Sequence, residues 1–109
     1  MLEFNKDNFE AEVLQADGLV MVDFWGEKCE PCLALMPEVV ALAEKNAGRA
    51  KFGKFNTAGS ARFLITQKVM GLPTIAFYKG GEKVVHLDKD AISEGGIAVV
   101  QSKLDELLA

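Results

Sequence analysis

The chain has 109 residues with a formal net charge of −4, and half of its residues are hydrophobic. This length is typical of one domain spanning residues 1–109, and the acidic balance argues against nucleic acids and anionic membranes as partners. No apolar run approaches the ~20 residues that span a bilayer, and the first residues lack the basic and apolar regions of a secretory signal. We therefore expect a cytoplasmic, monomeric protein.

The first predicted elements are a short strand and a helix. The strand is Leu2–Phe4, and Asn5 caps the helix that follows it. Asp17-Gly18 ends this helix. Its apolar residues recur at helical spacing: Phe9, Val13 and Leu14.

A buried strand and a long helix follow. Leu19–Trp25 is apolar at every position except Asp23, which is typical of a strand covered on both faces. From Cys29 the apolar residues are spaced to form one broad helical face, until Ala47-Gly48 ends the helix. Pro37 lies inside this helix and lacks an amide hydrogen, so a kink is expected there.

The second half of the chain contains three strands and two helices. Ser60–Lys68 is predicted as a short helix, and a final amphipathic helix begins at Ser93. Gly80-Gly81 accepts positive φ and predicts a hairpin between the last two strands. The strands are expected at Lys51–Asn56, Thr74–Tyr78 and Lys83–Leu87.

After the first strand and helix, from Leu19 onward, the predicted order of elements is β-α-β-α-β-β-α. A βαβ crossover makes its strands parallel, and a hairpin adds an antiparallel strand. We therefore predict an α/β fold with a central mixed β-sheet flanked by helices on both faces.

The only two cysteines lie in the segment Cys29-Glu30-Pro31-Cys32, where the buried strand gives way to the long helix. Free amides and the dipole at a helix N-terminus favour a thiolate at Cys29. The separation of three residues allows the sulfurs to bridge, and Pro31 stiffens the ring without losing a hydrogen bond. We expect Cys29 to attack a disulfide and Cys32 to resolve the mixed disulfide.

Two other uses of the cysteine pair have less support. A metal site needs two more ligands, and the chain offers only carboxylates and His86, which we expect at the surface; no metal is therefore predicted. A structural disulfide here closes a very short loop and stabilises little. Redox chemistry is the favoured function of the pair.

Asp23 is the one charged residue of its apolar strand. A buried carboxylate is costly and usually has a raised pKa, so near Cys32 it can accept the proton of the deeper thiol. The alternative is an exposed aspartate at a frayed strand end. Because Phe24 and Trp25 continue the apolar run, we favour the buried carboxylate.

Three separated segments follow the pattern of one known family. Residues 22–37, VDFWGEKCEPCLALMP, have an aspartate six residues before the first cysteine and a proline five residues after the second. Gly71-Leu72-Pro73-Thr74 and the hairpin at residues 78–82 follow in order. These segments resemble the active-site segment, the cis-proline signature and the hairpin of thioredoxins. The resemblance covers nearly the whole chain.

The resemblance implies the thioredoxin fold and a thiol–disulfide oxidoreductase that reduces protein disulfides without a bound cofactor. Electrons would come from a flavin-dependent thioredoxin reductase. By resemblance, Cys29 and Cys32 are the nucleophile and the resolving thiol. Asp23 would be the buried proton acceptor, and Lys54 would lie near it and modulate its charge.

The resemblance also implies a substrate groove. Pro73 would shape this groove, with a cis peptide bond before it. Leu72 and Thr74 would offer backbone groups to an extended peptide by strand-like pairing. Trp25 is expected to pack in the core or at the rim of the site, and it is also a candidate substrate contact.

Several positions depart from the thioredoxin pattern. Lys28 replaces a tryptophan, Glu30 a glycine, and Leu33 a common lysine, and Asp90 stands about where the family has a glycine. Lys28 favours the Cys29 thiolate and Glu30 disfavours it, and both are screened by solvent. We expect altered partner choice, in the substrates or in the reductase.

Two other functions compete with this one. A disulfide oxidant or isomerase would have a higher reduction potential, and a thioredoxin-fold binding module would use its thiols only incidentally. The missing signal sequence favours the reductant. The combination of the cysteine pair, Asp23 and Pro73 weakens the binding module, which needs none of them.

Overall fold

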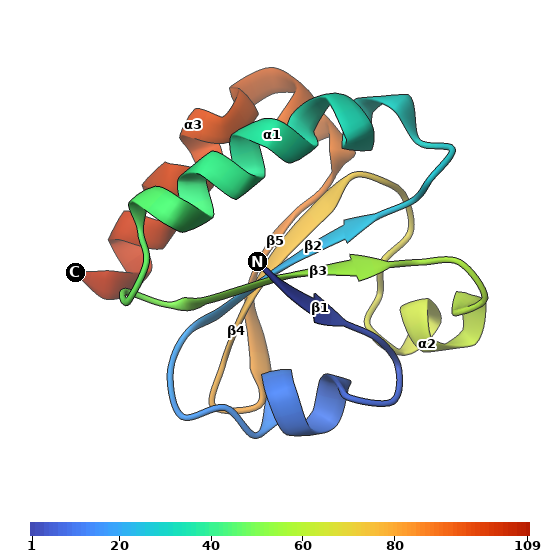
Figure 1. The fold of residues 1–109 in the computed structure, drawn as a ribbon, viewed down its shortest axis with the longest axis horizontal. Helices are drawn as coiled ribbons and strands as arrows, with labels where there is room; N and C mark the ends of the chain where they lie inside the picture. The colour runs from blue at the N-terminus through green and yellow to red at the C-terminus, as the bar shows by residue number, and fades with distance from the viewer.

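The computed structural model describes residues 1–109 and contains five strands and four helical segments (Figure 1). The strands are β1 (Leu2–Phe4), β2 (Val20–Trp25), β3 (Lys51–Asn56), β4 (Thr74–Lys79) and β5 (Glu82–Leu87). The helices are η1, a short π-helix (Glu10–Leu14), α1 (Glu30–Lys45), α2 (Ala61–Thr66) and α3 (Lys89–Leu108). No helix combines the length and hydrophobicity that a bilayer crossing requires.

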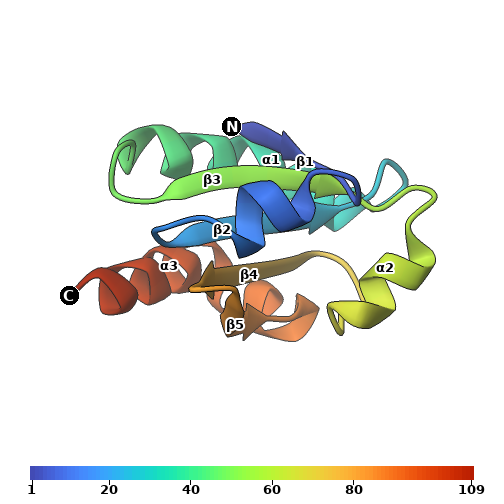
Figure 2. The same cartoon turned by 90° about the horizontal axis from the view of Figure 1, so that it is seen from below.

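The strands form one mixed sheet in the order β1-β3-β2-β4-β5. β3 is parallel to β1 and β2, whereas β4 is antiparallel to β2 and β5 is antiparallel to β4. The expected crossover into a parallel β4 is therefore wrong. A six-residue helix such as α2 is about 9 Å long, less than half the length of the strands, and α2 lies beyond their ends (Figure 2). The chain consequently re-enters the sheet from the end at which β3 leaves it.

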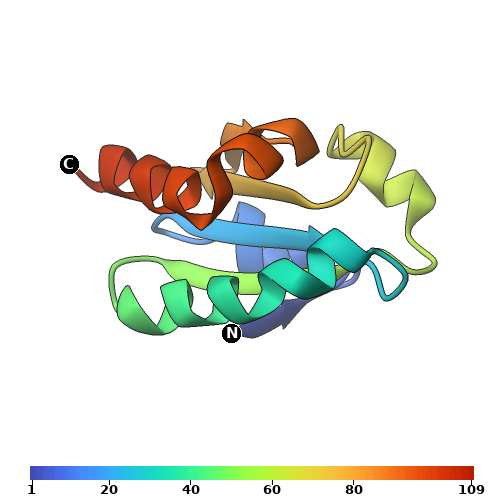
Figure 3. The ribbon, with the colours of Figure 1, turned by 90° about the horizontal axis from the view of Figure 1, so that it is seen from above.

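Helices cover both faces of the sheet, as predicted. α1 and α3 lie side by side over one face (Figure 3), and their aliphatic side chains pack on β2 residues such as Met21. The other face packs against η1 and α2 through a cluster that includes Val22 and Phe24. Successive residues of β2 thus enter opposite layers of the core, as the pleat of a strand requires.

The first helical segment is shorter than its sequence predicts. Asn5 does cap this turn, because its Oδ1 accepts hydrogen bonds from the amides of Asp7 and Asn8, both at 2.8 Å. The backbone then widens into the π-helix η1, which still buries Phe9 and Val13. The apolar spacing therefore identifies the buried face correctly, whereas the hydrogen-bonding pattern is that of a π-helix and not of the ordinary helix that was predicted.

α3 begins four residues earlier than predicted. Asp88 is its N-cap, and its Oδ1 accepts the amide hydrogen of Ala91 at 2.9 Å. Gly96 interrupts the helix with φ 61° and ψ −159°, so a short first segment meets the longer second segment at a kink. The prediction recognised the helix only from Ser93 onward, because two glycines just after Ser93 obscure the helical periodicity.

Candidate active site

Cys29 is held at the point where the loop after β2 enters α1. Its amide donates to the Gly26 carbonyl at 3.1 Å, and its extended backbone (φ −92°, ψ 99°) makes it the N-cap of the helix. Its Sγ accepts the amide hydrogen of Cys32 at 3.3 Å. A helix N-terminus thus points a free donor at this sulfur, which is the arrangement that favours a thiolate.

Cys29 and Cys32 form a disulfide, with a Cα–Cα distance of 5.2 Å. Cys29 is half-buried, whereas Cys32, one turn into α1, is only 1% exposed. Pro31 lies in the first turn, where its missing amide hydrogen removes no helical bond. Only the outer sulfur is therefore accessible to a partner protein.

Asp23 is buried on the face of the sheet that α1 covers. It follows Met21 of β2 and Leu19, just before the strand, at every second position of the chain, and it is 1% exposed. Neither of its carboxylate oxygens has a hydrogen-bond partner. Burial raises the pKa of Asp23 to about 7, although the positive charge of Lys54 acts in the opposite direction. The predicted burial of this carboxylate is correct.

Lys54 stands beside Asp23 in the sheet. The two residues are register partners in the parallel pair β2–β3, so their side chains share one face. They do not form an ion pair; instead, the Lys54 ammonium lies 5.6 Å from the centre of the Trp25 ring. The indole N–H of Trp25 is buried without a partner. Lys54 therefore acts on Asp23 through space.

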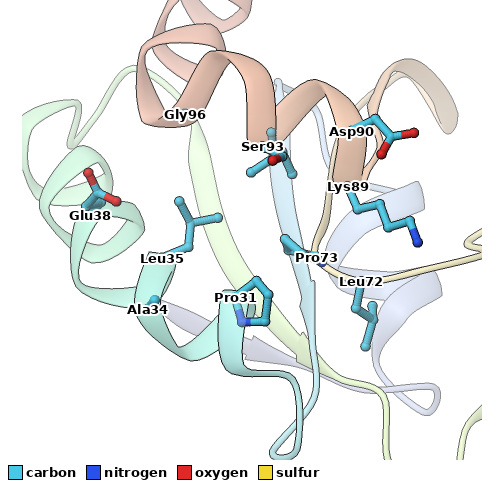
Figure 4. Close-up of a pocket in the computed structure, with 11 residues that line it drawn as sticks. Pro31, Ala34, Leu35, Glu38, Leu72, Pro73, Lys89, Asp90, Ser93 and Gly96 are labelled. Atoms are coloured by element: carbon cyan, nitrogen blue, oxygen red, sulfur yellow. The ribbon is translucent and has the colours of Figure 1, made fainter.

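Pro73 and Leu72 border a hollow of about 580 Å³ between the start of α1 and the start of α3 (Figure 4). The Leu72–Pro73 bond is cis, and Pro73 is buried. Thr74 begins β4, and its hydroxyl donates to the Gly71 carbonyl at 2.6 Å. The hollow places the predicted proline signature beside Pro31 of the cysteine motif.

A second hollow of about 400 Å³ lies on the other side of Leu72 and is bordered by Cys29 and Lys28. Leu72 thus separates two depressions, one of which reaches the outer sulfur. The Leu72 amide and carbonyl make no hydrogen bond with other backbone groups. An extended peptide can pair with these free groups.

The residues that depart from the thioredoxin pattern border this site. Lys28, Glu30 and Leu33 are exposed around the disulfide. Asp90 lines the hollow beside Pro73, together with Lys89. Asp90 is already among the positions that the sequence singles out, and the structure adds Lys89 to the candidate site. The capping pattern that begins at Asp88 was the sequence signal for this placement.

Lys83 lies in β5, the second strand of the hairpin. Lys83 is partly buried: its ammonium donates to the Gln67 carbonyl and lies 2.9 Å from Nδ1 of His86. Burial and the charge of Lys83 lower the pKa of His86. His86 is exposed, as predicted. The structure contains no group of three or more histidine, cysteine or acidic side chains placed to hold a metal.

Comparisons with known proteins agree with this geometry. The thioredoxin family model matches residues 1–100. The chain is 48% identical over 103 residues to a thioredoxin of Peptoclostridium acidaminophilum, with 94% of both chains covered. It is 44% identical over 103 residues to a thioredoxin of Acetoanaerobium sticklandii, with 94% of this chain and 98% of that one covered. A thioredoxin of Chlorobaculum thiosulfatiphilum is 35% identical over 104 residues, or 95% of this chain and 93% of its own.

The fold and the paired cysteines define a thiol–disulfide oxidoreductase. The chain belongs to the thioredoxin family, whose members reduce protein disulfides through a redox-active disulfide and are themselves reduced by thioredoxin reductase. These similarities do not favour an oxidant, an isomerase or a binding module. The family, the fold and the redox function predicted from the sequence are confirmed.

Proposed function

We propose that Cys29 is the nucleophile and Cys32 the resolving thiol of this oxidoreductase. We further propose that the protein transports electrons in the cytoplasm and acts as a monomer, with a single domain spanning residues 1–109. The main support is the difference in burial of the two sulfurs. Cys29 is half-buried at a helix N-terminus, whereas Cys32 is 1% exposed. An incoming disulfide can therefore reach only the outer sulfur.

The exchange proceeds in two steps. The Cys29 thiolate attacks one sulfur of the substrate disulfide, so that a mixed disulfide forms and the other substrate sulfur leaves as a thiolate. The Cys32 sulfur then attacks Sγ of Cys29, which forms the internal disulfide and releases the second substrate thiolate. The cysteine pair loses two electrons and the one proton of Cys32, the substrate disulfide gains the two electrons, and the two released thiolates take their protons from water.

Asp23 is proposed as the proton acceptor of the second step. Its pKa of about 7 lies near neutral pH, where a general base is most effective. Its carboxylate has no competing hydrogen bond and lies on the face of the sheet that α1 covers, as does Cys32. Lys54 modulates this base by favouring its charged form.

The substrate peptide is proposed to lie against the proline signature. The free backbone groups of Leu72, together with the start of β4 at Thr74, suit strand-like pairing with an extended segment. Pro73 forms the wall between this segment and the cysteine motif. Trp25, beside Lys54, supports the rim of the site and contacts substrate.

The electron donor is proposed to be a flavin-dependent thioredoxin reductase with a surface suited to this chain. Lys28, Glu30 and Pro31 surround the exposed sulfur and modulate its reactivity and its partners. A charged Lys28 changes the contact surface beside the nucleophile where thioredoxins usually have a large aromatic residue. Partner choice is therefore expected to differ more than the chemistry does.

Reduction of insulin disulfides by wild type, Cys29→Ser and Cys32→Ser tests the assignment. Cys29→Ser should be inactive, and Cys32→Ser should accumulate a covalent complex with substrate because it cannot resolve it. Val84→Ser, at an exposed position of β5, should match wild type. Substantial activity in Cys29→Ser, or a trapped complex in Cys29→Ser instead of Cys32→Ser, contradicts the assigned roles.

A further inference from the structure

The hollow beside Pro73 runs from Pro31 of the cysteine motif along α1 as far as Glu38. A further hollow of about 400 Å³ lies between α1 and α3, and both hollows are bordered by Glu38. We call the two together the α1–α3 groove. Small side chains widen it on both helices: Ala34, Ala41, Gly96 and Ala98. Leu35 and Pro73 point into its first part (Figure 4).

We infer that the α1–α3 groove extends the substrate site, and that Glu38 selects substrates with a lysine or arginine about four residues from the attacked cysteine. This inference rests on the proposed function and identifies a substrate class for it: disulfide-containing segments with a basic residue at this distance. The occupant is an extended polypeptide segment of the substrate protein.

The distance from the reacting sulfur sets the position of the basic residue. Glu38 is nine residues beyond Cys29, which is about 13 Å along a helix at 1.5 Å per residue. An extended peptide advances about 3.3 Å per residue, so roughly four residues cover the same length. A peptide that pairs at Leu72 and continues along the groove therefore brings its fourth residue to Glu38.

The charges of the groove favour a cation at this point. Glu38 is exposed and forms no ion pair, and its neighbours in the groove include Leu42 and Ile97. Lys89 and Asp90 offset each other near the disulfide. Lys45 is the only cation in the distal part, about two turns beyond Glu38. A lysine or arginine can extend its methylene groups over the apolar wall and place its charge at Glu38.

The expected preference is modest because Glu38 is exposed to solvent. Exposed ion pairs change an equilibrium by about two- to five-fold, and salt screens them. Wild type should therefore reduce a disulfide peptide with lysine at the fourth position about two- to five-fold faster, in kcat/KM, than the same peptide with glutamate there. The ratio should decrease at high ionic strength.

The test uses fluorogenic disulfide peptides with lysine, glutamine or glutamate four residues before or after the reacting cysteine. The proteins are wild type, Glu38→Gln, Glu38→Lys and the control Glu44→Gln, an equal charge change at an exposed position of α1 outside the groove. The lysine-to-glutamate ratio should fall toward one in Glu38→Gln, invert in Glu38→Lys and persist in Glu44→Gln.

A ratio near one for wild type at both positions overturns the inference. A ratio that survives Glu38→Gln also overturns it, because the preference then comes from another group. A ratio that falls equally in Glu44→Gln does so too, because the preference then comes from the overall charge of the protein. Insulin reduction by wild type is measured in parallel. If wild type does not reduce insulin, the proposed function itself is overturned. If wild type reduces insulin but shows no peptide preference, only the role of Glu38 is overturned.

Discussion

The two faces of the sheet are built from different kinds of side chain. On the η1–α2 face, aromatic rings pack together around Phe9, whose centroid lies 5.0 Å from that of Phe63 and 5.3 Å from that of Tyr78. On the α1–α3 face the core is mostly aliphatic, and it contains the buried, unpartnered carboxylate of Asp23. The first face has no buried side-chain polar atom without a hydrogen-bond partner, whereas the second has the unpartnered atoms of Asp23 and Trp25.

A single strand supplies both kinds of surface. In β2, Phe24 enters the aromatic face, and Asp23, its neighbour in sequence, enters the face under α1. A buried unpaired carboxylate costs free energy, and burial of large apolar side chains offsets such a cost. The comparison indicates that the aromatic face stabilises a sheet whose opposite face contains a costly buried carboxylate. This separation can be tested by changing one face at a time.

The largest expected effect on stability comes from the aromatic face. Phe9→Ala removes the ring that packs against Phe24, Phe55, Phe63 and Tyr78, so the free energy of unfolding should fall by about 3–5 kcal/mol. The reduction potential of the folded protein should stay at the wild-type value, because the disulfide lies at the start of α1 on the other face. Urea denaturation and equilibration with a thiol–disulfide buffer measure the two quantities.

Val84→Ala is the control for this prediction, because Val84 is 45% exposed. Its free energy of unfolding should change by less than about 0.5 kcal/mol. A shift in the reduction potential of Phe9→Ala as large as that of an active-site variant would show that the two faces are not independent.

A smaller effect, with the opposite sign, is expected on the other face. Asp23→Asn removes a carboxyl group whose pKa is raised from 3.8 to about 7 by burial. Between these values folded wild type binds more protons than the unfolded chain, so its stability falls as pH rises through this range and is constant above it. At 1.36 kcal/mol per unit, the loss is about 4 kcal/mol. The asparagine amide is also buried without partners, so the net gain of the variant at pH 8 should be about 2 kcal/mol.

The same substitution should slow the chemistry. Without a proton acceptor at position 23, resolution of the mixed disulfide should slow by about 10²-fold or more near neutral pH, the usual contribution of a general base. Stopped-flow release of a labelled substrate thiol measures this step. Equal pH profiles of stability for wild type and Asp23→Asn, or an unchanged release rate, would remove Asp23 from the mechanism.

The face of the sheet that contains the redox site was the easier of the two to predict from the sequence. Cys29 and Cys32 are separated by three residues at a strand–helix junction, and Asp23 interrupts an apolar run; both patterns are local. The sequence patterns that predict the strand positions and the glycine hairpin are likewise local, and Gly80 and Gly81 do adopt positive φ. Each of these features depends on a few neighbouring residues, and for that reason the structure agrees with them.

What the sequence did not predict depends on contacts between distant segments. The direction of β4 follows from where the short α2 lies relative to the sheet, and no residue of β4 encodes that placement. The groove beside Pro73 needs α1 and α3 side by side, so Glu38 and Ser93 had no signal of their own. The early start of α3 was readable at Asp88, but the two glycines that follow weakened the helical pattern.

The smallest expected effect concerns the link between Lys54 and Asp23. The Lys54 charge lowers the pKa of Asp23, so Lys54→Gln should move the pH at which stability is lost to higher values. Lys54→Arg keeps the charge and should leave this midpoint in place, and Lys79→Gln, at an exposed end of β4, should leave it unchanged as well. Both glutamine variants remove one positive charge, so only a through-space effect at Asp23 distinguishes them. An identical midpoint in Lys54→Gln and Lys79→Gln would mean that Asp23 is tuned by burial alone, and the role of Lys54 would then be limited to packing on Trp25.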